Sequence, residues 1–346
     1  MSNMFFLDQC PTCGSKDFSS PFAEKLADDN TLGHFIITHP QKKYDGINLD
    51  LFRKVGWRVC NFCTQIFCLK RPMVDGLETW YNQLFFDSEH RDYDVNPLPL
   101  KYVQNQKNFA DQLYDILDKN NVFEAVTSVL HFRCHAGFLL KKIADNKKIS
   151  EVYGLEYFEN PAKHAQNLLG AERVARITGP EPHNPFKKSK FDLILLEHFL
   201  THAHNPGHFL NYVKSLLSDR GKIVVFNEPD HSKSFLSGSF YRRGINFFHK
   251  QLFTNKTLVF FLKAHSIDGI ELPHPPGLDW AVANNSLLFV GKLGNIQKPC
   301  KQNPQPVTDL IQSWFRKHNY YQKIYWIRKK FKDLKRLTKR AKNLVR

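Results

Sequence analysis

The chain lacks long hydrophobic runs. None of its 346 residues lies in a stretch that approaches the roughly 20 consecutive apolar residues needed to span a bilayer. Residues 1–8 also lack the basic start and long apolar core of a secretory signal peptide. These absences argue against an integral membrane protein and a secreted one. We therefore expect a cytoplasmic protein, in a compartment that keeps thiols reduced.

What the chain does contain suits a globular protein. Its hydrophobic content of 42% is sufficient for a core, and its length fits a small module followed by one large domain. The 30 phenylalanines recur within periodic segments, so we expect most of them to serve core packing.

Four of the seven cysteines form two Cys-x-x-Cys pairs, Cys10 with Cys13 and Cys60 with Cys63. Two such pairs can close a tetrahedral zinc site without an open ligand position, which is the pattern of a structural metal. The alternative is a pair of redox or disulfide sites, which a reducing compartment disfavours. The other cysteines are isolated and are expected to be buried apolar residues: Cys68, Cys134 and Cys300.

The most informative stretch covers residues 129–140, where an apolar strand runs into a turn and a helix. It resembles the first strand and loop of the Rossmann-type class I methyltransferases. In that family an acidic residue ends the strand, and a Gly-x-Gly-x-Gly turn lets the backbone approach S-adenosylmethionine. His131 stands in place of the acid, Arg133 and His135 in place of the first two glycines, and Gly137 keeps the third.

Further segments follow in the order that such a domain requires. Glu156 ends the second strand nineteen positions after Gly137, close to the spacing of about 20 typical of this fingerprint. Because strands alternate with helices, the sequence predicts an α/β fold with a parallel, Rossmann-like sheet. The later matching segments are 191–202 with its acid Glu197, a helix opened by Asn205-Pro206, an apolar strand at 221–229, and 247–258, where a His precedes Phe253-Thr254 and a capped helix.

The resemblance implies a cofactor site formed by Gly137, Glu156, His131, His135 and Glu197, with Glu156 binding ribose hydroxyls. Side chains at glycine positions bring bulk and positive charge to the loop. Pro180 likewise replaces the usual acid beside the adenine. Two readings stay open: a S-adenosylmethionine-dependent methyltransferase, or a non-catalytic relative that scaffolds partners or binds another anionic ligand.

The zinc-ribbon pattern joined to this domain narrows the resemblance. With residues 66–72 and 78–81, it is similar to bacterial methyltransferases of sugar and surface-polysaccharide pathways, which implies a sugar or glycan precursor as acceptor. Candidate bases are His198 and His249, because methyl transfer to a hydroxyl needs a base near neutral pH. The alternative for each of these two histidines is a structural role. Glu228 is expected to bind the acceptor or to cap a segment.

The net charge of +16 is concentrated at the C-terminus. From Arg316 onward there are thirteen Lys or Arg residues and one acid, Asp333, with apolar residues at intervals of three or four. This basic amphipathic helix could lie peripherally on an anionic membrane, bind nucleic acid, or dock on the protein itself. Aromatic residues near its start favour the membrane surface. No RNA-recognition motif is evident elsewhere, which weakens the nucleic-acid reading.

The expected organisation is therefore a zinc-ribbon module (residues 1–75), a Rossmann-like methyltransferase domain (76–295), a linker (296–307) and a basic helical tail (308–346).

Overall fold

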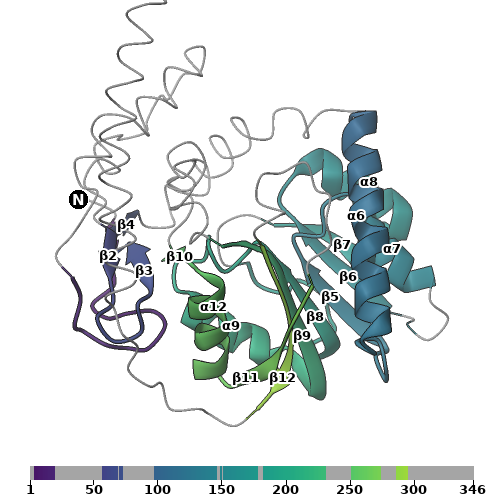
Figure 1. Ribbon diagram of the computed structural model, residues 1–346. Coiled ribbons are helices and arrows are strands. Elements are labelled where there is room, and N and C mark those ends of the chain that lie inside the picture. Colours follow the sequence, from purple (N-terminus) through teal and green to yellow (C-terminus); the bar gives the residue numbers. More distant parts are fainter. Residues whose placement is uncertain are drawn as a thin grey trace, which may run out of the picture.

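The computed structural model describes residues 4–19, 57–68, 70–72, 97–145, 149, 151–177, 182–230, 251–273 and 286–294. The linker and the basic tail lie outside these residues, and so do Pro180, His249 and Cys300. The described chain forms one large α/β domain with a small cysteine-containing module beside it (Figure 1).

The domain is built on a seven-stranded sheet with the order β11-β12-β9-β8-β5-β6-β7. The strands from β7 to β9 run parallel, and β12 lies antiparallel to both β9 and β11. This confirms the predicted α/β fold; the predicted parallel pairing holds from β7 to β9, while β11 and β12 make the sheet mixed. The bounds are β5 Ser128–Phe132, β6 Glu151–Glu156, β7 Val174–Arg176, β8 Phe191–Glu197, β9 Leu217–Pro229, β11 Ile267–Leu272 and β12 Ser286–Leu293.

Strand order reverses at β5, which has β6 on one side and β8 on the other. In open parallel sheets, the crevice outside the carboxyl ends of the strands at such a switch point is where ligands bind. The loops after β5 and β8 therefore border the place where a ligand is expected.

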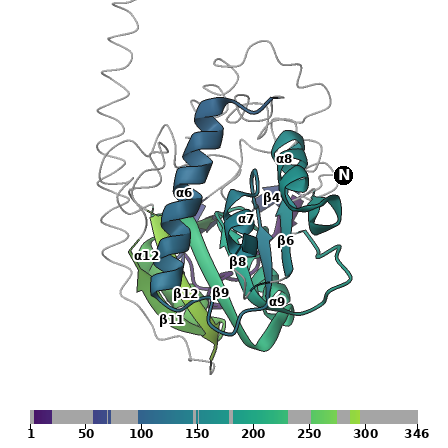
Figure 2. The same cartoon turned by 90° about the vertical axis from the view of Figure 1, so that its right-hand side faces the viewer.

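The central strands are apolar on both faces because helices cover both sides of the sheet. In β8, Leu193 and Leu195 pack into one core, and Ile194 and Leu196 pack into the other, as the two-residue period of a strand requires. Helices α6 (Leu100–Lys119), α7 (Phe138–Asp145) and α8 (Glu159–Leu169) cover the first face (Figure 2). Helices α9 (Pro206–Ser215) and α12 (Asn255–Ala264) cover the second.

Side-chain caps fix where the second pair of helices begins. The Asn205 side chain accepts from the His208 amide at 3.2 Å, with Pro206 at the first helical position. Thr254 forms a reciprocal capping box with Thr257 at the start of α12. Both helices start where the sequence predicted.

Asp192 ties together the starts of three strands. Its carboxylate accepts hydrogen bonds from Thr127 and Ser128 before and within β5, and from Ser218 in β9. Partial burial opposes ionisation, but these donors outweigh it and lower the pKa of Asp192 to about 2. Asp192 therefore stabilises the amino ends of these strands, opposite the candidate site at their carboxyl ends.

The cysteine module shares a sheet with the large domain. Strands β2 (Trp57–Val59) and β3 (Ile66–Cys68) pair antiparallel, and β10 (Gln251–Leu252) of the large domain adds to β3. A second small pair is formed by β1 (Met4–Phe6) and β4 (Lys70–Pro72). Helices α9 and α12 lie between this module and the main sheet (Figure 1).

Among the described residues, no helix is long and apolar enough to cross a bilayer.

Candidate functional site

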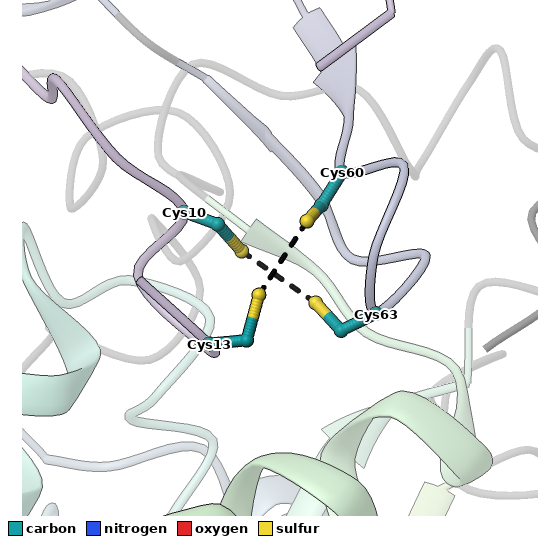
Figure 3. Close-up of side chains that lie close together, drawn as sticks. All are labelled: Cys10, Cys13, Cys60 and Cys63. Atoms are coloured by element: carbon teal, nitrogen blue, oxygen red, sulfur yellow. Dashed lines mark hydrogen bonds between the residues drawn. The ribbon is translucent and has the colours of Figure 1, made fainter. Parts of the chain in front are cut away.

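The four paired cysteines converge on one point (Figure 3). Their sulfur atoms all lie within 4.8 Å of one another, with Cys10 3.6 Å from Cys63 and Cys13 3.5 Å from Cys60. Tight turns shape both pairs: the Gly14 amide donates to the Cys10 carbonyl, and Gly14 takes the positive φ of 73° that its lack of a side chain permits. Cys68 and Cys134 are separate and buried, as expected.

The geometry of this cluster fits a zinc ion and does not fit disulfides. Disulfide sulfurs lie about 2.05 Å apart, whereas four sulfurs at about 2.3 Å from a tetrahedral zinc lie about 3.8 Å from one another. Burial raises the pKa of the Cys10 thiol, and a divalent cation would reverse that effect by stabilising thiolates. With four protein ligands the centre would be closed, so its role would be structural.

Strained backbone gathers at the carboxyl edge of the main sheet. Of the eight non-glycine residues with positive φ in the described chain, four lie here: Arg133 (69°), His135 (51°), His198 (48°) and Asn227 (58°). A left-handed conformation costs a residue with a side chain roughly 1–2 kcal/mol. Such strain is found at functional sites, where neighbouring interactions hold it in place.

The side chains of this edge meet around Glu197 at the end of β8. Its carboxylate lies 3.2 Å from Nε2 of His135 and 3.4 Å from Nε2 of His131, and it accepts from the Asn227 amide at 2.7 Å. All four residues are buried. Burial alone would raise the pKa of Glu197, but the two histidines outweigh it and hold that pKa well below its usual range. Burial lowers the pKa of His131, so the neutral imidazole is favoured there.

A second contact joins the two loops. Nη1 of Arg133 lies 3.2 Å from Nδ1 of His198, whose ring also packs against His202 at a centroid distance of 4.7 Å. A guanidinium only donates, so Nδ1 of His198 accepts and the neutral ring carries its hydrogen on Nε2. In this arrangement the buried Nε2 of His198 is a donor. To act as a base His198 would have to exchange its tautomer or its partner.

Two further carboxylates, of Glu156 and Glu228, accept hydrogen bonds from the backbone of the loops at this edge. Glu156, at the end of β6, accepts from the backbone amides of His135 (2.6 Å), Tyr157 (2.9 Å) and Phe158 (3.0 Å) and has no exposed surface. Glu228, at the end of β9, accepts from the amides of residues 199–201 and from the Thr201 hydroxyl. Glu228 therefore caps the loop after β8, one of the two roles expected for it, and burial raises its pKa.

The residues present fit S-adenosylmethionine in part. The loop after β5 keeps positive φ at positions 133, 135 and 137, the backbone form of a glycine-rich cofactor loop. However, a carboxylate has roughly four acceptor positions, and Glu156 already uses three of them. At most one position is left for a ribose hydroxyl, not two as the resemblance implies, and the fully buried carboxylate presents no surface to it in this arrangement.

Gly137 has a packing role. A side-chain carbon added there would lie 2.8 Å from Cβ of Ala165 in α8, a distance that real contacts do not show. The glycine thus permits α7 and α8 to approach each other closely behind the loop.

The structure brings most predicted site residues together. His131, His135 and Glu197 are in direct contact, Glu156 joins them through the backbone of residue 135, and His198 joins through Arg133. His249 lies outside the described residues, so its assignment stays a prediction.

Two members of the cluster escaped the sequence reasoning. The Tyr102 hydroxyl, from α6, lies 3.5 Å from Nδ1 of His135. Asn227 was detectable in principle, as a lone amide that follows the apolar run at 223–226. Tyr102 gave no such signal, because its helix is amphipathic with or without a ligand.

Residues 130–223 match a protein-family model described as a methyltransferase domain. A search of the curated proteins found no match.

Among solved structures, the chain is similar to magnesium protoporphyrin IX methyltransferase of Synechocystis PCC 6803 with bound SAH (12% identity, 63% of this chain, 98% of that one, TM-score 0.43). It is also similar to a SAM-dependent methyltransferase of Thermotoga maritima (15% identity, 62% and 99%, TM-score 0.42). A third is DesVI of Streptomyces venezuelae (16% identity, 57% and 96%, TM-score 0.42). Likenesses at this level carry no conclusion about substrate.

The family match covers the segment that contains the strand-order reversal together with His131, His135 and Glu197. Residues 130–223 thus match a methyltransferase-domain model, and they lie within a mixed, mostly parallel sheet of Rossmann-like strand order covered by helices on both faces.

Proposed function

We propose that this chain is a S-adenosylmethionine-dependent methyltransferase that acts on a sugar or glycan precursor. The observation that carries the proposal is the loop after β5, in which positions 133, 135 and 137 keep the left-handed backbone of a cofactor loop although two of them are not glycine. Strain of roughly 1–2 kcal/mol per residue, repeated at two positions of one loop, is typical of backbone whose shape serves a ligand.

Three residues of this edge have a role in the proposal. S-adenosylmethionine would supply an activated methyl group on a positively charged sulfonium. Glu197, ionised and buried, provides negative charge at this edge, and Glu156 has one acceptor position left for a ribose hydroxyl. Arg133 suits an acceptor that carries a phosphate, because a guanidinium donates charge-assisted hydrogen bonds to anions.

The acceptor class rests on the attached cysteine module. Its two Cys-x-x-Cys pairs are joined to the domain through β10, and this combination is what resembles the sugar and polysaccharide enzymes. The acceptor is the finer part of the proposal, and activity with sugar substrates is its separate test.

Calorimetry with S-adenosylmethionine tests cofactor binding. We expect weak binding to the wild type and tighter binding to the Arg133→Gly/His135→Gly double variant, which frees the loop of side chains. Ala125→Gly is the matched control, since Ala125 has a similar φ of 59° in the loop that precedes β5, at the opposite edge of the sheet. No heat of binding and no thermal shift at millimolar ligand, in either the wild type or the double variant, would refute the proposal.

One observation favours a second candidate, a non-catalytic protein that scaffolds partners or binds a different anion. Glu156 is fully buried and bound to three amides of its own chain, so the domain holds its loop without a ligand. Stabilisation of the wild type by inorganic pyrophosphate, together with no response to S-adenosylmethionine, would select this candidate.

A further inference from the structure

The cysteine module and the candidate site are connected by β10. Its two residues pair with β3, opposite Phe67 and Ile66, so the large domain supplies the third strand of the module's sheet. Gln65 strengthens this junction: its side-chain amide donates to the Leu252 carbonyl at 3.3 Å and to the Ile66 carbonyl at 2.9 Å. The Gln65 carbonyl in turn accepts from the amide of Cys60, within the second cysteine pair.

The neighbouring residue of β10 holds the loop after β8, which we call the β8 loop (residues 198–204). The side-chain amide of Gln251 donates to the carbonyls of Leu200 (2.9 Å) and Ala203 (2.8 Å). Gln251 has no exposed surface, so these are hydrogen bonds shielded from water. Replacing Gln251 by an apolar residue would leave the Leu200 and Ala203 carbonyls without this hydrogen-bond donor, so we expect the replacement to destabilise the β8 loop.

The β8 loop carries His198 and His202, and it contacts the loop after β5 through Arg133. Glu228 fixes the amides of residues 199–201, while Gln251 fixes carbonyls of the same turn. The β8 loop is therefore held by two buried side chains, Glu228 from the main sheet and Gln251 from the strand shared with the module.

The first cysteine pair also docks firmly. A side-chain carbon added to Gly207, at the start of α9, would lie 3.1 Å from the Pro11 carbonyl, so the backbone of this pair rests directly on the helix. Phe260 of α12 packs against the small core that contains Cys10 and Cys63. The module is thus anchored at several points, and its internal order can be transmitted to the domain through contiguous packed contacts.

We infer that metal binding at Cys10, Cys13, Cys60 and Cys63 controls the position of the β8 loop through Gln65 and Gln251, and that Gln251 is the positioning residue of this connection. A zinc ion orders the second cysteine pair, that pair orders Gln65 and β3, and β3 orders β10. The Gln251 side chain then sets the turn that carries His198 and His202. The inference concerns the chain's own contacts and does not depend on methyl transfer.

Coupling of this kind is reciprocal. If zinc stabilises the β8 loop, then loosening the loop must weaken zinc binding by the same factor, typically about five-fold or more. Gln251 touches no cysteine of the cluster in any hydrogen bond described above. A change in zinc affinity on its replacement therefore reports coupling and not the loss of a ligand.

The test uses the full chain with its metal and compares Gln251→Leu with Gln166→Leu. Gln166 in α8 makes a similar amide-to-carbonyl hydrogen bond, to Val174 at 3.0 Å, remote from the module. Two quantities are measured: zinc retention against a competing chelator, and hydrogen exchange at the amides of His202 and Ala203, which donate to the Phe199 carbonyl.

For Gln251→Leu we expect faster exchange at both amides with zinc still bound, and zinc affinity lowered about five-fold or more. Gln166→Leu should change neither, and chelation of zinc from the wild type should speed exchange at the same amides. The inference is overturned if Gln251→Leu binds zinc like the wild type, or if its β8 loop is equally protected. Should the zinc-free wild type unfold altogether, the zinc-loaded Gln251→Leu variant still decides the question.

Discussion

Replacing His135 by glycine tests whether the contacts of the His135 side chain stabilise the protein by more than its strained backbone costs. The ring contacts Glu197 at 3.2 Å in a buried setting, and depriving a buried polar group of a partner costs about 1–3 kcal/mol, with charged groups at or above the upper end. Glu197 is ionised but keeps Asn227 and His131 as neighbours, so a cost of about 3 kcal/mol applies.

Glycine also removes the left-handed penalty of roughly 1–2 kcal/mol but adds unfolded-state entropy worth roughly 0.5–1 kcal/mol. The net expectation for His135→Gly is a loss of about 2 kcal/mol in the free energy of unfolding. His135→Ala keeps the backbone strain and should lose about 1 kcal/mol more than the glycine variant.

Urea denaturation at pH 7 measures both variants. Combining His135→Gly with Glu197→Gln should cost less than the sum of the single changes, because no unpaired charge is then left buried. If His135→Gly proved as stable as the wild type, or more stable, the contact with Glu197 would contribute nothing, and the reasoning about this cluster would be wrong.

Three further predictions follow from the structure and the sequence. Burial lowers the pKa of His131, so its contribution to stability is present above the unfolded pKa of about 6.5 and is lost as pH falls below it. The melting temperature of His131→Phe should therefore decline less between pH 7 and pH 5 than that of the wild type. An unchanged slope would contradict this. Cys60→Ser should release the zinc, expected at about one ion per chain, and lower the melting temperature, whereas metal-free wild type with an unaltered melting curve would disprove the site. Deleting residues 308–346, which lie outside the described residues, should abolish sedimentation with anionic vesicles, and equal recovery of both proteins in the supernatant would point to another role for this basic segment.

The sequence by itself determined the architecture. Apolar strands, the caps at Asn205 and Thr254 and the order of segments are local signals, and each one sets its own element with little help from the rest of the chain. The cysteine cluster was predictable for the same reason, since two Cys-x-x-Cys turns each position a ligand pair within four residues.

Only the tertiary structure decided what the candidate site residues do. The spacing of Glu156 predicted a ribose ligand, but the folded chain surrounds its carboxylate with three backbone amides. Glu197 became the centre of the cluster because β5, β8 and β9 lie side by side and bring their carboxyl ends together. No local pattern indicated the role of Gln251 in holding the β8 loop, since its partners lie about fifty residues away. Burial, partner geometry and the competition of backbone donors for a carboxylate arise from long-range packing, and no local pattern of residues contains them.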